Sequence, residues 1–166
     1  IAGATTIEGG DGNDVFRVNV DSEGAQTNLS GVAAELTLNG KKGSDKYEIG
    51  LAGDDNAVIN LFDDSVSGIN SARLLGTTQS DYFLFRGNET TGMVGLVQSD
   101  IDGQAVVGGS FERVNYDGNI SSLVVEGREG DDYFVFDETF SPITVFGGAG
   151  NDTFQLGQIY ESARDG

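Results

Sequence analysis

The chain has 166 residues and a formal net charge of −18, with 27 acidic residues against 9 basic ones. Such a surface repels nucleic acid and anionic membranes and attracts divalent cations, so we expect neither a nucleic-acid partner nor insertion into a membrane. The sequence has no cysteine and no histidine, which excludes disulfide bonds, thiolate metal sites and the usual Ser-His-Asp and Cys-His catalytic groups within the chain.

Five windows of eight residues, which we call the first to fifth corners, repeat one pattern. Position 1 is always Gly, position 6 is always Asp and position 8 is always Phe or Tyr, while position 4 is Gly in every corner except the third. The corners span residues 9–16, 40–47, 76–83, 127–134 and 147–154. Such repeats are typical of proteins built from stacked structural units.

Apolar residues alternate with polar ones on both sides of the corners. After the first corner, for example, Phe16, Val18 and Val20 fall on one face of an extended chain. A period of two predicts half-buried strands, so each unit is predicted to be a strand, a corner and a second strand. Residues 56–61 predict a further strand without a corner.

These units predict an all-β fold, a right-handed parallel β-solenoid with glycine-rich corners. We expect residues 1–166 to form a single solenoid segment, as a fragment or one repeat of a longer tandem array. The leading glycines lie 31, 36, 51 and 20 residues apart, and the longest interval predicts a degenerate coil between Gly92 and Val107. The ring at position 8 is predicted to be buried and stacked between coils. An exposed carbohydrate platform is the alternative.

The chemistry of the corners favours calcium, which takes six to eight oxygen ligands. Glycines let the backbone adopt left-handed conformations that turn several carbonyls towards one point, and the Asp at position 6 adds a carboxylate. One corner supplies about three oxygens and two stacked corners about six, so a site is expected to be shared between neighbouring corners. The alternative at every corner is that the Asp only caps backbone N–H groups of its turn.

The corners differ in how well they suit a cation. The fourth and fifth corners are the best pair, and the first has a complete motif whose partner is either the second corner or lies outside the chain. Lys41, Lys42 and Lys46 oppose a cation in the second corner, and the third is predicted to be a plain turn. Two acidic pairs, Asp54 with Asp55 and Asp63 with Asp64, are predicted to be solvated loop charge. The candidate ligands, through side chains or backbone carbonyls, are Gly9, Asp11, Gly12, Asn13, Asp14, Gly43, Asp45, Gly127, Glu129, Gly130, Asp131, Asp132, Gly147, Ala149, Gly150, Asn151 and Asp152.

The corners resemble the repeat-in-toxin (RTX) nonapeptide Gly-Gly-x-Gly-x-Asp-x-apolar-x. Residues 9–17 and 147–155 match its fixed positions in full, whereas residues 40–48 and 127–135 carry Lys41 and Arg128 at the second glycine. Residues 76–84 keep only the first Gly, the Asp and the Phe. The resemblance implies a parallel β-roll or β-helix, calcium-dependent folding and secretion. Because the copies do not follow one another every nine residues, the chain is more similar to the irregular repeat regions of large bacterial surface proteins and adhesins.

The expected function is a calcium-binding structural repeat of a secreted bacterial surface protein, acting as a rigid extracellular spacer, adhesin or filament and matrix module. Ca²⁺ is the expected cofactor, and no enzymatic activity and no catalytic residues are expected. Neighbouring repeats or other copies stacked head to tail are the expected partners, with extracellular glycans or cell surfaces as further ones. The alternative is a polysaccharide lyase-like enzyme on a parallel β-helix that uses calcium, with Arg86, Arg113 or Arg128 as its base.

Overall fold

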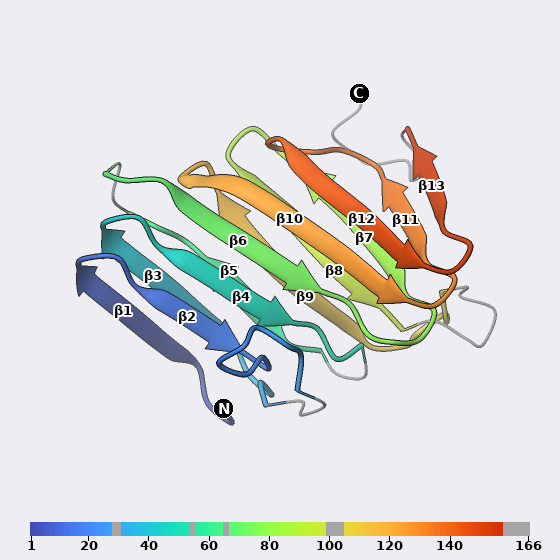
Figure 1. Ribbon diagram of the computed structural model, residues 1–166, viewed down its shortest axis with the longest axis horizontal. Coiled ribbons are helices and arrows are strands. Elements are labelled where there is room, and N and C mark those ends of the chain that lie inside the picture. Colours follow the sequence, from blue (N-terminus) through green and yellow to red (C-terminus); the bar gives the residue numbers. More distant parts are fainter. Residues whose placement is uncertain (28–30, 54–55, 65–66, 99–104, 158–166) are drawn as a thin grey trace.

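The computed structural model describes residues 1–27, 31–53, 56–64, 67–98 and 105–157, and the regular secondary structure of these residues is β-strand (Figure 1). Within them, no helix is long and apolar enough to cross a membrane. The strands are β1 (Thr5–Asp11), β2 (Val15–Val18), β3 (Leu36–Lys42), β4 (Lys46–Gly50), β5 (Val58–Leu61), β6 (Asn70–Leu75), β7 (Tyr82–Gly87), β8 (Thr91–Val97), β9 (Phe111–Asp117), β10 (Ile120–Glu129), β11 (Tyr133–Phe136), β12 (Ile143–Ala149) and β13 (Thr153–Leu156).

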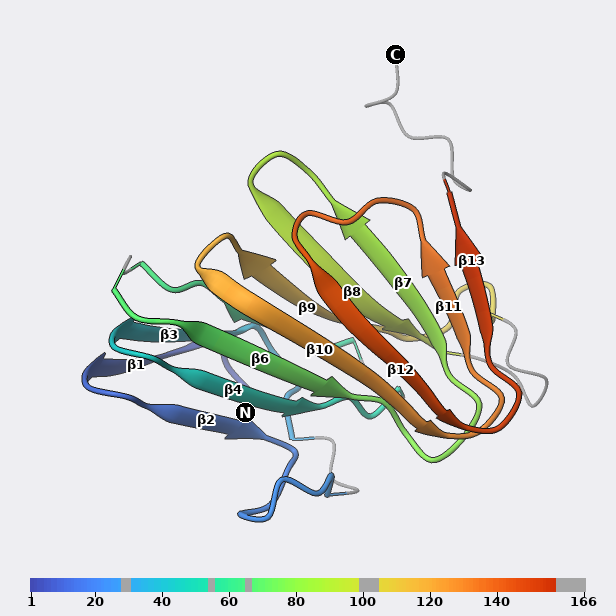
Figure 2. The same ribbon diagram turned by 45° about the horizontal axis from the view of Figure 1, so that its top comes forward.

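The strands form two sheets that enclose the core between them (Figures 1 and 2). The large sheet has eight strands in the order β1-β3-β5-β9-β8-β7-β11-β13, and the small sheet has five in the order β12-β10-β6-β4-β2. Every corner carries the chain from one sheet to the other, so the predicted unit of strand, corner and strand is confirmed at all five positions. The strand predicted at residues 56–61 is also present, as β5.

The predicted right-handed parallel β-solenoid is wrong. The large sheet is mixed and the small sheet is parallel, and neither closes into a solenoid. The expected degenerate coil between Gly92 and Val107 is instead replaced by β8, which pairs antiparallel with both β7 and β9. In the large sheet, β9 and β8 lie between β5 and β7, whereas in the small sheet β6 pairs directly with β10. The strands of the two sheets therefore do not correspond one to one.

A tight turn explains why β8 reverses direction. Only residues 88–90 separate β7 from β8, and the side-chain Oδ1 of Asn88 accepts hydrogen bonds from the backbone N–H groups of Thr90 (2.8 Å) and Thr91 (2.9 Å). A connection of this length can join antiparallel neighbours, whereas parallel neighbours need a crossover of a dozen or more residues. The local turn chemistry therefore overrides the parallel pattern of the other strands.

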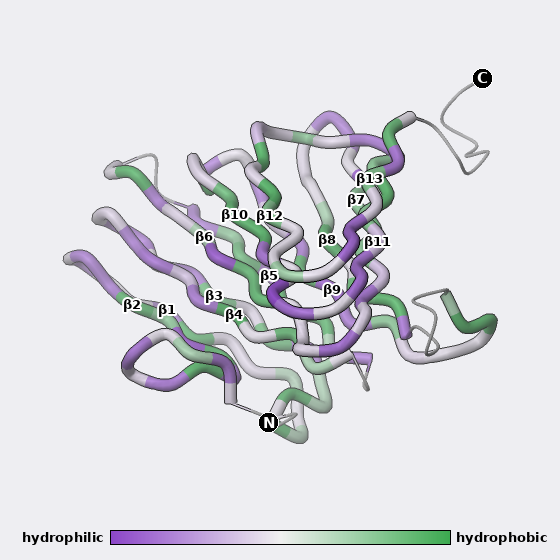
Figure 3. The backbone as a smooth tube through the Cα atoms, turned by 45° about the vertical axis from the view of Figure 1, so that its right-hand side comes forward, coloured by the Kyte–Doolittle hydropathy of each residue, from purple (hydrophilic) through white to green (hydrophobic). Residues whose placement is uncertain are grey.

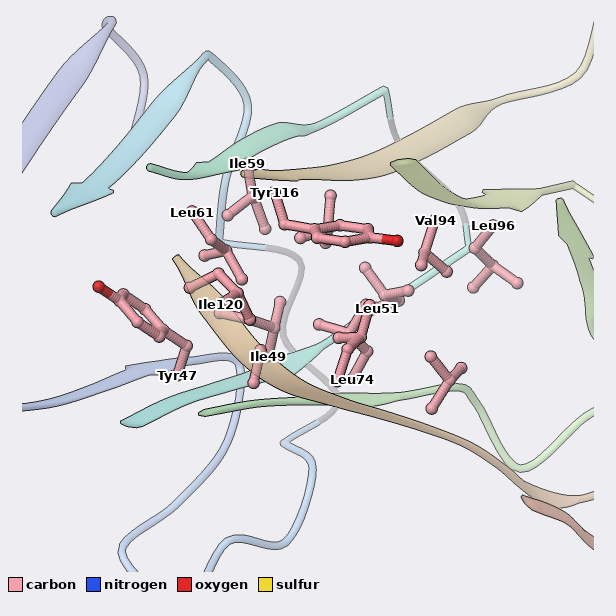
Figure 4. Close-up of a cluster of buried hydrophobic side chains, with 14 of the residues drawn as sticks. Tyr47, Ile49, Leu51, Ile59, Leu61, Leu74, Val94, Leu96, Tyr116 and Ile120 are labelled. Carbon is pink, nitrogen blue, oxygen red and sulfur yellow. The ribbon is translucent and has the colours of Figure 1, made fainter. Parts of the chain in front are cut away.

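The core lies between the inner faces of the sheets, as the period-two alternation predicts (Figures 3 and 4). Parallel pairing places Leu38 beside Ile7 on one side and Leu61 on the other, so the apolar positions before successive corners align. The strands β8 and β9 also contribute inward residues, among them Leu96 of β8 and Tyr116 of β9. Burial of these rows provides the main force that holds the two sheets together.

The aromatic rings at position 8 form two stacks. Phe16 lies parallel to Tyr47 with ring centroids 5.0 Å apart, and Phe134 lies between Phe83 (5.0 Å) and Phe154 (4.9 Å). Four of the five rings are buried, and Phe154, in the last strand of the large sheet, is 46% exposed. The prediction of buried, stacked rings is thus confirmed for four corners, and the carbohydrate platform at this position is not supported.

The corners lie at two opposite edges of the molecule (Figure 1). The first and second corners lead from the large sheet to the small sheet, whereas the third, fourth and fifth lead from the small sheet to the large one. The number of intervening strands explains this division, because each strand crosses the sheet once. Two, four and two strands separate corners at the same edge, whereas β4, β5 and β6 separate the second corner from the third.

Candidate metal centre

The corners form two polar stacks, one at each edge. The first stack contains the first and second corners, where β1 pairs with β3 and β2 with β4. The second stack contains the third, fourth and fifth corners, where β10 lies between β6 and β12, and β11 lies between β7 and β13. Neighbouring corners in a stack are therefore one strand spacing apart, about 4.8 Å. The predicted pairings of the fourth corner with the fifth and of the first with the second both occur.

The Asp residues at position 6 form a ladder in each stack. In the first stack, the backbone N–H of Asp14 donates to Oδ1 of Asp45 (2.7 Å), and the N–H of Asp45 donates to Oδ1 of Asn70 (2.9 Å). In the second stack, the N–H of Asp81 donates to Oδ1 of Asp132 (2.9 Å). The N–H of Asp132 in turn donates to Oδ1 of Asp152 (3.1 Å). Oδ1 of Asp45, Asp132 and Asp152 therefore caps the neighbouring turn.

A second ladder at position 5 holds the turns together. Oδ1 of Asn13 accepts the backbone N–H of Ser44 (2.8 Å), and Oδ1 of Asp131 accepts the N–H of Asn151 (2.7 Å). In the fifth corner, the carbonyl of Ala149 accepts the N–H of Gly130 (3.0 Å). These predicted ligands are thus brought together between corners, where they satisfy backbone groups.

The leading glycines are needed for space. None of them has a positive φ, in contrast to the prediction that their role is a left-handed backbone. A Cβ on Gly127 would overlap Oδ2 of Asp132 and would lie 2.5 Å from the carbonyl oxygen of Gly147. A Cβ on Gly9 would likewise overlap the carboxylate of Asp14 and lie 2.9 Å from a neighbouring carbonyl oxygen. A carboxylate oxygen and a carbonyl oxygen therefore converge over these glycines.

The left-handed backbone occurs instead at positions 2 and 4. Its φ is positive at position 4 of every corner with glycine there, in Gly12, Gly43, Gly130 and Gly150. At position 2, Lys41 (φ 72°) and Arg128 (φ 86°) adopt the conformation that glycine adopts in the first and fifth corners. The third corner has no positive φ at Thr77 or Gln79, so its turn is different, as its degraded sequence predicts.

Three of the ladder carboxylates have an oxygen without a partner. Oδ2 of Asp14, Asp45 and Asp132 is buried and makes no hydrogen bond, and the Asp45 and Asp132 residues are each 1% exposed. An unpaired buried charge is strongly destabilising, so a counter-charge beside these oxygens would stabilise the fold. The alternative that the Asp residues only cap turns accounts for Oδ1 of Asp45 and Asp132 and leaves Oδ2 unexplained.

The third corner satisfies its carboxylate internally. Oδ2 of Asp81 accepts the backbone N–H of Thr77 (2.6 Å), and Oδ1 accepts the Thr77 hydroxyl (2.8 Å). Thr77, which replaces the second glycine, therefore gives both carboxylate oxygens of Asp81 a hydrogen-bond partner. This arrangement agrees with the prediction of a plain turn at the third corner.

The lysines of the second corner pair away from its carboxylate. Lys41 lies 2.9 Å from Glu8 and 2.8 Å from Asp64, and Lys42 lies 3.3 Å from Asp11. Lys46 pairs with a carboxylate of its own strand, in Glu48. The lysines therefore leave Oδ2 of Asp45 without a counter-charge, although the sequence predicted that they would oppose a cation there.

Asp63 was predicted to be solvated, and this prediction is wrong, whereas Asp54 and Asp55, for which the same prediction was made, lie outside the described residues. Asp63 is fully buried, and its Oδ2 accepts hydrogen bonds from the Asn70 amide (2.9 Å) and the Tyr47 hydroxyl (3.2 Å). Asn70 thus takes the capping place that Asp holds in the corners. The sequence signal was Gly68-Ile69-Asn70, which repeats positions 4 to 6 of the corners with Asn in place of Asp, although no glycine stands at position 1.

Candidate ligands outside the ladders are exposed. Asp11 and Glu129 lie at position 3 with their side chains in solvent. Among the described residues, no group of three or more Asp, Glu, His or Cys side chains is placed to hold a metal ion by itself. An ion at the corners would therefore rely on backbone carbonyls together with one or two carboxylates, which is the donor set that the sequence predicts.

Burial and mutual repulsion raise the pKa values in the second stack. Burial raises the pKa of Asp132 to about 7, and the neighbouring charges of Asp81, Asp152 and Asp131 add to the rise. Burial also raises the pKa of Asp81 to about 6, partly offset by its hydrogen bonds from Thr77. The native second stack therefore holds protons more tightly than the unfolded chain does.

The metal-free protein is expected to be more stable at pH 5 than at pH 8. The folded pKa values of Asp81 and Asp132 lie above the ordinary value of 3.8, so their stabilising contribution is complete below about pH 4 and is lost as the pH rises through about 6 to 7. Thermal melting of metal-stripped protein, followed by circular dichroism, measures this. A melting temperature that falls from pH 8 to pH 5 would contradict the raised pKa values.

Two of the three arginines of the lyase alternative, Arg86 and Arg113, lie on the large sheet and away from the corners. Arg86 lies 2.9 Å from Asp137 on the large sheet, and Arg113 lies on β9 of the same sheet. Only Arg128 lies in a corner, and its guanidinium donates hydrogen bonds to the side chain of Gln26 and to the carbonyl of Gly76. Arg128 therefore supports the contact between corners, and no observation places a free base beside a ladder carboxylate in the described residues.

Comparisons of the chain with protein-family models, with curated proteins and with solved structures gave no match.

Proposed function

We propose that this chain is a calcium-binding structural module of a secreted bacterial surface protein. The supporting observation is the set of buried carboxylate oxygens without partners at Asp14, Asp45 and Asp132. A divalent cation beside these oxygens would neutralise their charge, and because the pKa of Asp132 is raised only to about 7, Asp132 is charged about half of the time at neutral pH. Oxygen-only donors in a chain without Cys or His suit calcium.

The residues that would hold the ion follow from the geometry. In the second stack they are Asp132, Asp152 and the carbonyl of Gly147, which lies with Oδ2 of Asp132 over Gly127. In the first stack they are the carboxylates of Asp14 and Asp45. Bound calcium supplies positive charge between neighbouring turns, so its binding energy becomes stability of the stacked corners.

The exposed ends of the two sheets support a role as a module that stacks on another. At one end, β1 and β2 are the terminal strands, and a cavity of about 350 Å³ is lined by apolar residues that include Ile7, Val15 and Phe16. At the other end, Phe146 is 56% exposed and Leu156 is 76% exposed. Unpaired edge strands with apolar neighbours favour pairing with another chain or repeat. We infer that a neighbouring repeat or a second copy covers these ends.

Thermal melting with and without calcium tests the proposal. Addition of calcium to metal-stripped protein at pH 8 is expected to raise the melting temperature by roughly 5–10 °C, since an ion at a hundredfold excess over Kd adds about 2.7 kcal/mol. Magnesium at equal ionic strength serves as the control and is expected to give a smaller shift, because it prefers a rigid octahedral shell. Equal shifts with both ions, or none with calcium, would contradict the proposal.

A further inference from the structure

A pocket lies on the large sheet where the antiparallel strand is inserted. It has a volume of about 390 Å³ and is lined by residues of β7, β8 and β9 and of the turn that follows β7. Arg86, Met93 and Asn115 are neighbours across the three strands, and Arg113 lies two residues before Asn115. This size falls in the lower part of the range of small-molecule sites, about 300–1,000 Å³.

The absence of a side chain on β8 shapes this pocket. Gly95 is the residue that pairs with Arg113, and a Cβ on it would overlap the ring of Phe111. The Phe111 ring therefore lies over β8 and forms an apolar wall beside the two arginines. Met93 is the long side chain that β8 itself contributes between Arg86 and Asn115.

The charge of the pocket is opposite to that of the whole chain. Eight of the nine lysines and arginines lie in the described part of the sequence. Of these eight, Arg113 is the one for which the structure shows neither an ion pair nor a side-chain hydrogen bond, and its Nε is buried without a partner. In a protein with 27 acidic residues, an arginine left unpaired in a pocket is an unusual feature.

Arg86 is held at the same pocket by a buried carboxylate. Its Nε lies 2.9 Å from Oδ2 of Asp137, whose side chain is 4% exposed. The two atoms are close enough for an ion pair but are not aligned for a hydrogen bond, so the Nε–H of Arg86 is also unsatisfied. Asp137 therefore holds the guanidinium in place without accepting a hydrogen bond from its Nε–H.

We infer that this pocket binds a carboxylate-bearing sugar, such as a uronic acid unit of an extracellular polysaccharide. A guanidinium matches a carboxylate with two parallel hydrogen bonds, and Arg113 has the free donors for this. The side chains of Asn88, Asn115 and Thr91 offer polar groups to sugar hydroxyls, and Phe111 offers an apolar surface to the ring. The charge of the rest of the chain is screened beyond about 8 Å in physiological salt. The inference does not depend on calcium at the corners.

Nuclear magnetic resonance titration of the calcium-saturated protein tests this inference. The probes are methyl glucuronide, methyl glucoside, acetate and sulfate, compared at constant ionic strength. We expect methyl glucuronide to shift the guanidinium signals of Arg113 and Arg86, and to bind at least about tenfold more tightly than the other three. Equal binding of the glucoside would show that the carboxylate is not recognised, equal binding of acetate or sulfate would show that the sugar is not, and no binding by any probe would overturn the inference.

Substitutions separate the pocket from general charge effects. Arg113→Gln and Arg113→Lys are each expected to weaken glucuronide binding at least about tenfold, because the lysine keeps the charge but loses the fork of donors. Arg17→Gln is the matched control, since it removes one charge from the small sheet, where Arg17 pairs with Glu48. An equal loss in Arg17→Gln would overturn the inference, and so would full binding by both Arg113 variants with unchanged circular dichroism spectra.

Discussion

Without calcium, the Asp132→Asn variant is expected to melt at a higher temperature than the unmodified protein at pH 8. The amide keeps Oδ1 as the acceptor for the N–H of Asp81 and removes the buried charge at Oδ2. The new Nδ2 can donate to the carbonyl of Gly147, which converges with it over Gly127. A repulsive pair of oxygens thus becomes a hydrogen bond.

The expected gain is on the order of 2 kcal/mol, or roughly 5 °C. The rise in the pKa of Asp132 from 3.8 to about 7 sets an upper bound of about 4 kcal/mol, and relaxation around the charge lowers the real value. Calcium is expected to stabilise the variant less than the unmodified protein, because one ligand has lost its charge. A higher melting temperature of the variant without calcium, together with a smaller rise when calcium is added, distinguishes an ion ligand from a turn cap.

The control for Asp132→Asn is Glu138→Gln. Glu138→Gln makes the same change in net charge at an exposed residue beyond the far end of β11, away from the corner. Its melting temperature is expected to change by less than about 1 °C in both conditions, in line with surface substitutions. If Asp132→Asn instead destabilises the metal-free protein, the charge of the Asp132 carboxylate is already satisfied there and the residue acts as a turn cap. The calcium proposal would then lose its main support.

Gly40→Ala is expected to destabilise the protein by about 3 kcal/mol, a fall of roughly 10 °C in melting temperature. The added methyl group would overlap the carboxylate of Asp45 and lie 2.7 Å from its Cβ. Asp45 cannot move freely, because it is 1% exposed and caps the N–H of Asp14. A shift of the backbone would also disturb the hydrogen bond from the N–H of Gly40 to the Tyr47 hydroxyl (2.8 Å).

A double-mutant cycle assigns this loss to the carboxylate. In an Asp45→Gly background, Gly40→Ala is expected to cost at least about 1 kcal/mol less than in the unmodified protein. Gly3→Ala is the control, because a Cβ there meets nothing within 4 Å, and no measurable change is expected. An equal cost of Gly40→Ala in both backgrounds, measured by urea unfolding, would show that contact with Asp45 is not the cause.

Local patterns were enough to predict the strands and corners. Alternation around residues such as Leu38 and Val125 identifies strands because one face of each is buried, and the Gly and Asp positions identify turns. The path of the chain between corners was not predictable in the same way. The reversal at β8 depends on a turn of three residues at Asn88, and one such turn changes a parallel arrangement into a mixed sheet.

The candidate site was predicted in part. The aspartates of the motif and their pairing between corners follow from spacing, because equal motifs on neighbouring strands come into register. The third corner was correctly separated from the others, since Thr77 replaces a glycine and its hydroxyl binds Asp81. Burial of Asp63 was missed because it depends on hydrogen bonds from Tyr47, which is distant in sequence, and from Asn70, which stands where the corners have Asp. The division of corners between two edges follows from the odd number of strands, β4, β5 and β6, between the second and third corners.

That division has a mechanical consequence. Two packed sheets that are joined along only one edge can separate at the opposite edge by rotating about the joined one. Here the capping ladder of Asp14 and Asp45 fastens one edge, and that of Asp81, Asp132 and Asp152 fastens the other. The two ladders lie at opposite edges and cover different parts of the sheets. A force that separates the sheets at either edge therefore acts on a stack of hydrogen-bonded corners before water can reach the core.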